Sequence, residues 1–102
     1  MGTVSAVPST WVISYDIVDD KRRTKAARLL QSHGQRVQYS VFEVLATEPE
    51  LDALLKDLTR EERFDAAPDS VRAWRLCAAC QGTARVVGQG PPLNVPGRPL
   101  VL

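Results

Sequence analysis

The carboxylates that follow the first apolar stretch are the residues of this chain best placed to do chemistry. Residues 11–15 (W-V-I-S-Y) are mostly β-branched or aromatic, which indicates a buried strand. Asp16 follows this strand directly, and Asp19 and Asp20 come shortly after it. The next residues carry a cluster of cations, namely Lys21, Arg22, Arg23 and Lys25. Acids at a strand end, followed by cations at a helix start, suit the binding of a metal ion and a phosphate.

One of these acids has a simpler explanation. Asp19 or Asp20 can cap the helix that follows, by accepting hydrogen bonds from backbone N–H groups that lack a partner inside the helix. Asp16 precedes the cap and follows an apolar strand, so capping does not explain it. Asp16 is therefore the candidate site residue. Arg22 and Arg23 are candidates for phosphate contact, with a solvated helix face as the alternative.

Composition limits the class of protein. The chain has 102 residues, which predicts one domain, and its net charge of +1 gives no global basic field, so any nucleic-acid binding needs a local patch. No apolar run approaches the roughly 18 residues that span a membrane. Residues 1–10 lack the basic start and apolar core of a signal peptide. We therefore expect a cytoplasmic protein that does not enter a membrane and that has an N-terminal extension over residues 1–10.

The two cysteines form a C-A-A-C motif at Cys77 and Cys80. A structural zinc site needs four ligands, and His33 is the only histidine. A redox C-x-x-C is typically found between a strand and a helix in a thioredoxin-like setting. We favour neither and interpret the pair as small apolar packing residues at a strand end.

The periodicity predicts alternating strands and helices. The expected strands are 11–15, 35–45, 70–77 and 84–87, and the expected helices are 21–32 and 48–59. T-E-P-E at 47–50 is a capping box for the second helix. Within 35–45, we expect Phe42 and Val44 on a mixed face that meets water or another subunit. Beyond a turn-rich linker, Leu100 to Leu102 is expected to form an edge strand, on its own sheet or, in preference, on a partner chain.

This order fits an α+β, ferredoxin-like βαββαβ sandwich with an extra C-terminal edge strand. Its helices would cover one face of a mostly antiparallel sheet, and a second protomer could cover the other face around a two-fold axis. We expect the domain over residues 11–93 and a tail over 94–102. Facing Asp16 carboxylates of two protomers would repel each other unless a cation lay between them.

Four stretches in colinear order carry a resemblance to a known family. They are Y-D-I-V-D-D-K-R-R, G-Q-R-V-Q-Y-S-V-F-E, D-S-V-R-A-W-R-L-C-A-A-C and V-V-G-Q-G-P-P-L, within residues 11–93. Together they resemble the small CRISPR-associated adaptation endonuclease family, the smaller of the universal Cas pair. The resemblance implies a homodimeric ferredoxin-like protein, a metal-dependent endonuclease of RNA or DNA. It also implies a place at the centre of the spacer-integration complex, with the larger Cas integrase as partner.

The resemblance also implies roles for individual residues. The metal-binding, catalytic aspartate of the family corresponds to Asp16, and Mg²⁺ suits such a carboxylate site. Arg22 and Arg23 match family cations that would contact nucleic acid, and Ser40 could place a hydroxyl near the metal or a phosphate. About ten residues precede Trp11, which is longer than is usual in the family. Two functions stay open: a Mg²⁺-dependent nuclease, and a non-catalytic scaffold that positions DNA for the integrase.

Overall fold

The computed structural model describes residues 7–88 and shows a four-stranded sheet with two long helices. The strands are β1 (Ser9–Asp16), β2 (Gly34–Gln38), β3 (Val41–Ala46) and β4 (Ser70–Leu76). The helices are α1 (Asp20–Gln31), α2 (Glu48–Leu58) and the short α3 (Ala78–Gln81). None of the helices formed by residues 7–88 has both the length and the apolar character needed to cross a membrane.

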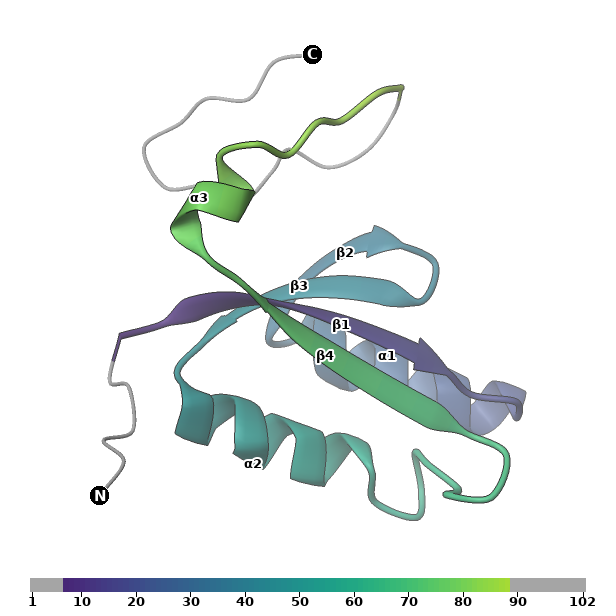
Figure 1. Cartoon of the computed structure of the whole chain (residues 1–102). Coiled ribbons are helices and arrows are strands. Elements are labelled where there is room, and N and C mark those ends of the chain that lie inside the picture. The colour runs from purple at the N-terminus through teal and green to yellow at the C-terminus, as the bar shows by residue number, and fades with distance from the viewer. Residues whose placement is uncertain (1–6, 89–102) are drawn as a thin grey trace.

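The sheet has the order β2-β3-β1-β4, and each neighbouring pair of strands is antiparallel. Strand β1 lies inside the sheet, where it pairs with β3 on one side and β4 on the other. Both α1 and α2 lie on the same face of the sheet (Figure 1). This arrangement confirms the predicted α+β, ferredoxin-like βαββαβ fold.

Local sequence signals explain where both long helices begin. The Asp19 carboxylate accepts a hydrogen bond from the Arg22 backbone N–H at 3.0 Å, which caps α1 and lowers the pKa of Asp19. At α2, the Thr47 hydroxyl accepts from Glu50 N at 3.3 Å, and Thr47 N donates to the Glu50 carboxylate at 2.8 Å. The predicted cap and capping box are therefore confirmed.

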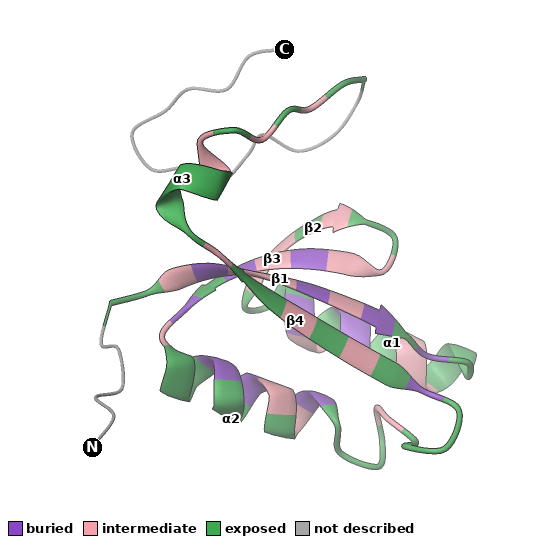
Figure 2. Ribbon diagram, viewed as in Figure 1, coloured by how far each residue is buried: buried purple, intermediate pink, exposed green. Residues whose placement is uncertain are grey.

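The core lies between the sheet and the two long helices. Ile13, Phe42, Leu30 and Leu58 are fully buried within it, and the Trp11 indole N–H donates to the Ala46 carbonyl at 2.9 Å. Figure 2 shows how more and less exposed residues alternate along β4, as expected for a strand with one covered face. The second face of the sheet has no long helix over it (Figure 1), so its side chains are available for other contacts.

The prediction of one long strand over 35–45 is wrong. The chain turns at Tyr39 and Ser40 and returns, so that β2 and β3 form an antiparallel hairpin with an irregularity between Arg36 and Gln38. Because the turn resets the alternation, Phe42 and Val44 lie in the core rather than on the mixed face predicted for them. No glycine or proline marks this turn, so it carries no strong signal in the amino-acid sequence.

The chain after β4 also differs from the prediction. Residues 84–87 form no strand; they follow α3 as irregular chain. Helix α3 is tied to the start of β1 by a hydrogen bond of 2.6 Å from the Gln81 amide to the Thr10 hydroxyl. The predicted edge strand Leu100 to Leu102 lies outside the described residues.

Candidate functional site

Asp16 is the last residue of β1, and its side chain is exposed. Ile13, Tyr15 and Ile17 point into the core, so the alternation of a strand places Asp16 on the opposite, helix-free face of the sheet. Its register partner on β4 is Ser70, also exposed. The carboxylate is therefore presented to solvent from an inner strand of the sheet, as a metal-binding group requires.

Ser40 lies beside this strand end, in the turn between β2 and β3. Its backbone carbonyl accepts a hydrogen bond of 3.1 Å from Tyr15 N, the residue before Asp16. The Tyr15 hydroxyl also approaches the neighbouring Tyr39 carbonyl at 3.4 Å. The structure thus brings Ser40 close to the strand end that carries Asp16, as the predicted site requires.

Arg22 has a structural partner within the protein. Its guanidinium contacts the Asp69 carboxylate through Nε at 3.1 Å and through Nη2 at 3.3 Å, and the Asp69 side chain is fully buried. Asp69 also accepts hydrogen bonds from the backbone N–H groups of Val18 at 3.0 Å and Asp65 at 2.9 Å. Arg22 therefore fixes the start of α1 beside the loop before β4, and its guanidinium is engaged within the protein.

These contacts decide the charge state of Asp69. Burial raises the pKa of the carboxyl group, but the hydrogen bonds from Arg22, Val18 and Asp65 favour the carboxylate more strongly. The pKa of Asp69 consequently lies below its ordinary value. We did not single out Asp69 from the sequence, because it is the last residue of a charged, proline-broken segment, residues 60–69, that is typical of a solvated loop.

Arg23 is held at the same end of the molecule. Its Nη1 donates to the Ile17 carbonyl at 3.0 Å, and its Nη2 forms an ion pair with Asp20. About a quarter of the side chain is exposed, at 27%. Arg23 thus retains access to solvent near the end of β1, with part of its hydrogen-bonding capacity already used.

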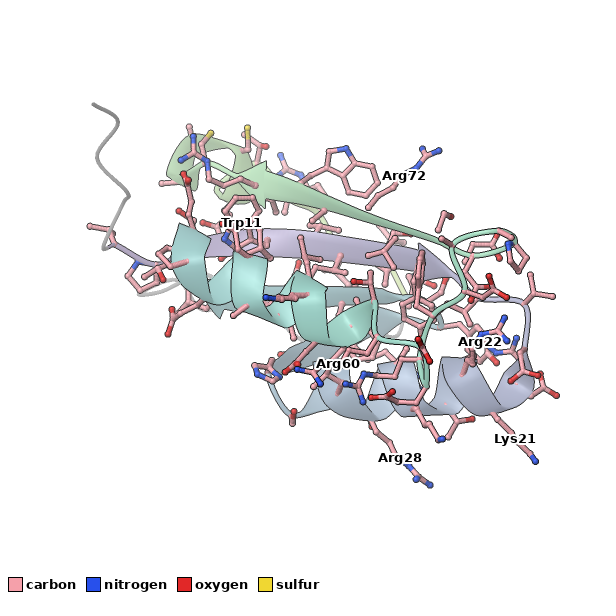
Figure 3. All side chains as sticks on the ribbon, turned by 90° about the horizontal axis from the view of Figure 1, so that it is seen from below. Trp11, Lys21, Arg22, Arg28, Arg60 and Arg72 are labelled. Atoms are coloured by element: carbon pink, nitrogen blue, oxygen red, sulfur yellow. The ribbon has the colours of Figure 1, made fainter. Side chains whose placement is uncertain are left out.

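The outer face of α1 carries three cations, none of which was predicted as a site residue. Lys21, Lys25 and Arg28 are exposed, and none of them has an ion-pair partner among residues 7–88. Their spacing of four and then three positions places them on one side of the helix. In Figure 3, Lys21 and Arg28 project away from the body of the protein, whereas Arg22 lies against it. The spacing itself was the signal that could have identified this basic stripe.

The end of β1 offers a metal ion the Asp16 carboxylate rather than a full set of ligands. Within residues 7–88, no three side chains of the usual metal-binding types gather into one group. Mg²⁺ commonly uses one or two protein carboxylates and completes its coordination with water and phosphate oxygens. The exposed Asp16 fits that mode of binding if a second copy of the chain or a nucleic-acid phosphate supplies further oxygens.

The two cysteines are exposed, so the interpretation of them as apolar packing residues is wrong. Cys77 caps α3, and its sulfur accepts from Cys80 N at 3.3 Å. A hydrogen bond from the Cys80 thiol, and then this backbone N–H, lower the pKa of Cys77. The bond to Cys77 raises the pKa of Cys80.

Comparison with known proteins places the chain in a family. The model of the CRISPR associated protein Cas2 family matches residues 9–84. A curated relative, CRISPR-associated endoribonuclease Cas2 1 of Chloroflexus aurantiacus, is 44% identical over 82 residues, which cover 80% of this chain and 87% of that protein. The family match therefore spans the whole described sheet and includes Asp16.

Two solved structures agree with this assignment. Streptococcus pyogenes Cas2 superposes with a TM-score of 0.67 at 31% identity and covers 78% of this chain and 99% of its own. A chain of a partial Cas6-RT-Cas1–Cas2 complex superposes with a TM-score of 0.58 at 27% identity, covering 92% of this chain and 99% of its own. Sequence and fold thus lead to one conclusion: the chain belongs to the Cas2 family of CRISPR-associated proteins.

Proposed function

We propose that this protein is a Mg²⁺-dependent endonuclease of the CRISPR adaptation machinery, which cleaves phosphodiester bonds of RNA or DNA and takes part in spacer acquisition. The observation that carries the proposal is the exposed Asp16 carboxylate at the end of β1, an inner strand of the sheet, in a Cas2-family chain. The endoribonuclease name of the Chloroflexus aurantiacus relative supports the nuclease over a purely scaffolding role.

The open sheet face supports a homodimer. It carries apolar side chains that the protein's own long helices do not cover, namely Val12, Val41, Leu45, Trp74 and Leu76. Leu45 and Trp74 are 53% and 50% exposed. A two-fold interface across this face would remove them from water, and a stable interface buries roughly 800 Å² on each partner.

We also propose that Leu100–Leu102 adds an edge strand to the partner, so deletion of residues 96–102 should weaken the dimer.

A homodimer would supply the second carboxylate that one chain lacks. Each protomer offers a single Asp16, and two such carboxylates near a two-fold axis would repel each other until a cation separates them. Mg²⁺ bound there would lower the pKa of a bound water and polarise a phosphodiester oxygen. In this arrangement Asp16 holds the metal, Arg23 contacts a phosphate near the strand end, and Ser40 orients the substrate through its hydroxyl group. Arg22 acts mainly by fixing the loop that carries its neighbours.

We further propose that the protein works in the cytoplasm with nucleic acid and with the larger Cas integrase. The solved complex that is named for both Cas1 and Cas2 supports that partner. The basic stripe of α1 would contact backbone phosphates, and such contacts weaken as salt rises. Nuclease and DNA-positioning roles can coexist, because Asp16 and the stripe lie on different elements.

The decisive experiment is a cleavage assay with purified protein, labelled RNA and DNA, and Mg²⁺. We expect cleavage that requires Mg²⁺ and is lost in Asp16→Asn, while circular dichroism shows an unchanged fold. Asp52→Asn is the matched control, since Asp52 is an exposed acid on α2 away from the site. Cleavage that persists undiminished in Asp16→Asn, in a preparation free of contaminating nuclease, would show that another residue is catalytic.

A further inference from the structure

A groove lies between α1 and the β2–β3 hairpin, and most of its lining residues have no part in the proposed nuclease site. Its volume is about 490 Å³, and its lining includes Asp20, Arg23, Arg28, Arg36 and Tyr39. We refer to it as the α1–hairpin groove. The volume falls within the range of sites that bind small molecules or single monomer units of a polymer.

The groove carries a net positive charge. Arg23 is paired with Asp20, so these two residues nearly cancel each other. Arg28 and Arg36 are exposed, and neither forms an ion pair with any residue of the described range 7–88. Two guanidinium groups on facing walls therefore provide donors for an anion, and guanidinium matches the geometry of a phosphate.

The hairpin wall also presents an aromatic ring to solvent. Tyr39 is 69% exposed, although tyrosine is a residue that usually buries most of its ring. The guanidinium carbon of Arg36 lies 5.8 Å from the centre of the Tyr39 ring and 5.2 Å from that of the buried Phe42. Phe42 thus anchors Arg36 to the core, and Arg36 is positioned beside the exposed ring.

An exposed aromatic ring next to unpaired cations is the combination that binds single-stranded nucleic acid. A duplex offers phosphates, but its base faces are stacked inside and cannot reach a tyrosine. A single strand offers both a phosphate and a free base face. Inorganic phosphate alone would make no use of the exposed face of the Tyr39 ring.

We propose that the α1–hairpin groove binds one nucleotide of a single-stranded nucleic acid, with the base stacked on Tyr39 and a neighbouring phosphate held by Arg28 and Arg36. The proposal rests on the proposed function only for the class of substrate. Tyr15 lines the groove and directly precedes Asp16, which lies on the other face of the sheet. The groove therefore lies near the same end of β1 as the proposed nuclease carboxylate, on the opposite face of the sheet.

The test is the affinity of fluorescently labelled single-stranded and duplex oligonucleotides of equal length, measured by anisotropy without Mg²⁺ so that nothing is cleaved. Tyr39→Ala should weaken single-strand binding about tenfold. The same change should alter duplex binding less than about twofold, because the duplex offers no free base face. Tyr39→Phe keeps the ring and should bind single strands like the unmodified protein.

Charge variants separate stacking from phosphate contact. Arg36→Ala changes a residue that lines the groove and does not belong to the basic stripe. It should lower single-strand affinity and reduce the slope of log affinity against log salt concentration (the salt slope) by about 0.7. Arg75→Ala is the matched control, because Arg75 is exposed on β4, at the opposite edge of the sheet from β2. It removes the same charge but should leave single-strand affinity within about twofold and the salt slope unchanged.

Three outcomes would overturn the proposal. They are single-strand affinity unaffected by Tyr39→Ala, an equal loss for single strand and duplex, and saturable binding of adenosine monophosphate as tight as that of the oligonucleotide. The last outcome would make the groove a site for free nucleotides. The result is independent of the nuclease assay, since Asp16→Asn should bind single strands normally even if it never cleaves.

Discussion

Arg22 and Asp69 are 47 positions apart in the chain, yet their side chains form an ion pair through two hydrogen bonds of 3.1 and 3.3 Å. The carboxylate in this pair is fully buried, whereas 23% of the arginine side chain is exposed. The pair joins the first turn of α1 to the residue before β4. Asp16, at the end of β1, pairs with Ser70, at the start of β4, so the ion pair stabilises the end of the sheet that carries the proposed catalytic residue.

Loss of the Asp69 carboxylate should destabilise the fold. We expect Asp69→Ala to lower the free energy of unfolding by roughly 3 kcal/mol, because Arg22 and two backbone N–H groups lose their acceptor. Urea denaturation followed by circular dichroism measures this value. Asp52→Ala, at an exposed position of α2, serves as the control and should change it by less than about 0.5 kcal/mol. Equal effects of the two changes would contradict a structural role for Asp69.

The same pair predicts how stability depends on pH. The pKa of Asp69 is depressed in the folded protein below its ordinary value of 3.8. The unfolded chain therefore takes up a proton first on acidification, so the contribution of Asp69 is complete above that ordinary value and declines as pH falls through the folded pKa. The difference in unfolding free energy between the unmodified protein and Asp69→Asn should consequently shrink in acid, which denaturation at a series of pH values would show. A difference that grows on acidification would contradict the direction of the pKa shift.

The cations of α1 should differ in their contributions, Arg22 to stability and the lysines to duplex DNA binding. Arg22→Ala should reduce stability, since the buried Asp69 loses its partner, and should change duplex DNA affinity little at low temperature, where the variant stays folded. Lys21→Ala combined with Lys25→Ala should leave stability nearly unchanged. It should lower duplex affinity and reduce the salt slope by about 0.9 for each phosphate that the variant no longer neutralises. Duplex binding that depends on Arg22 but not on the lysines would reverse this assignment.

The Cys77 thiol should react before the Cys80 thiol. Hydrogen bonds from Cys80 lower the pKa of Cys77, so more thiolate is present at Cys77 near neutral pH. Alkylation by iodoacetamide, followed by peptide mass spectrometry, measures both rates. In Cys80→Ala the thiol donor is removed, and the pH at which Cys77 becomes reactive should move up toward its ordinary pKa of 9.0. Equal rates for the two thiols at all pH values would contradict the asymmetry.

The open sheet face should control the oligomeric state. Trp74→Glu places a charge on the proposed interface and should shift the protein from dimer to monomer, as measured by sedimentation velocity at micromolar concentration. Trp74→Phe keeps an apolar ring and is expected to remain dimeric. The exposed side chain of Trp74 contributes little to the core, so both variants should fold. A Trp74→Glu variant that stays fully dimeric would place the interface elsewhere.

Prediction from sequence succeeded where a local pattern decides the structure. The strand before Asp16, the Asp19 cap and the Thr47 capping box depend on neighbouring residues, and all are present in the structure. The turn at Tyr39 and Ser40 was missed, because two polar-apolar alternations join there without a glycine or proline. The resemblance nevertheless implied the correct βαββαβ order.

The candidate site was predictable only in part, because its contacts join distant parts of the chain. Asp16 could be selected from its place after a strand. The partner of Arg22 could not be selected, since Asp69 lies far away in sequence within a loop of several acids and arginines. Arg22 was accordingly expected at a phosphate, whereas its guanidinium is occupied inside the protein. The α1–hairpin groove depends on the hairpin itself, so it could not be foreseen before that turn was known.

Because β1 lies inside the sheet, the face on which the Asp16 side chain lies is fixed by the pairing of β1 with both of its neighbours. A shift of β1 by one residue would exchange the two faces of the strand and place Asp16 in the core and Tyr15 in water. Such a shift would require the hydrogen bonds of β1 with β3 and with β4 to break together. Backbone amides of β1 should therefore exchange with solvent only when the whole domain unfolds. Amides of α3 should exchange through smaller openings, since that helix has four residues and none of them is buried. The proposed catalytic carboxylate thus belongs to the slowest-exchanging part of the molecule, and any mobility needed to admit a substrate has to come from other segments.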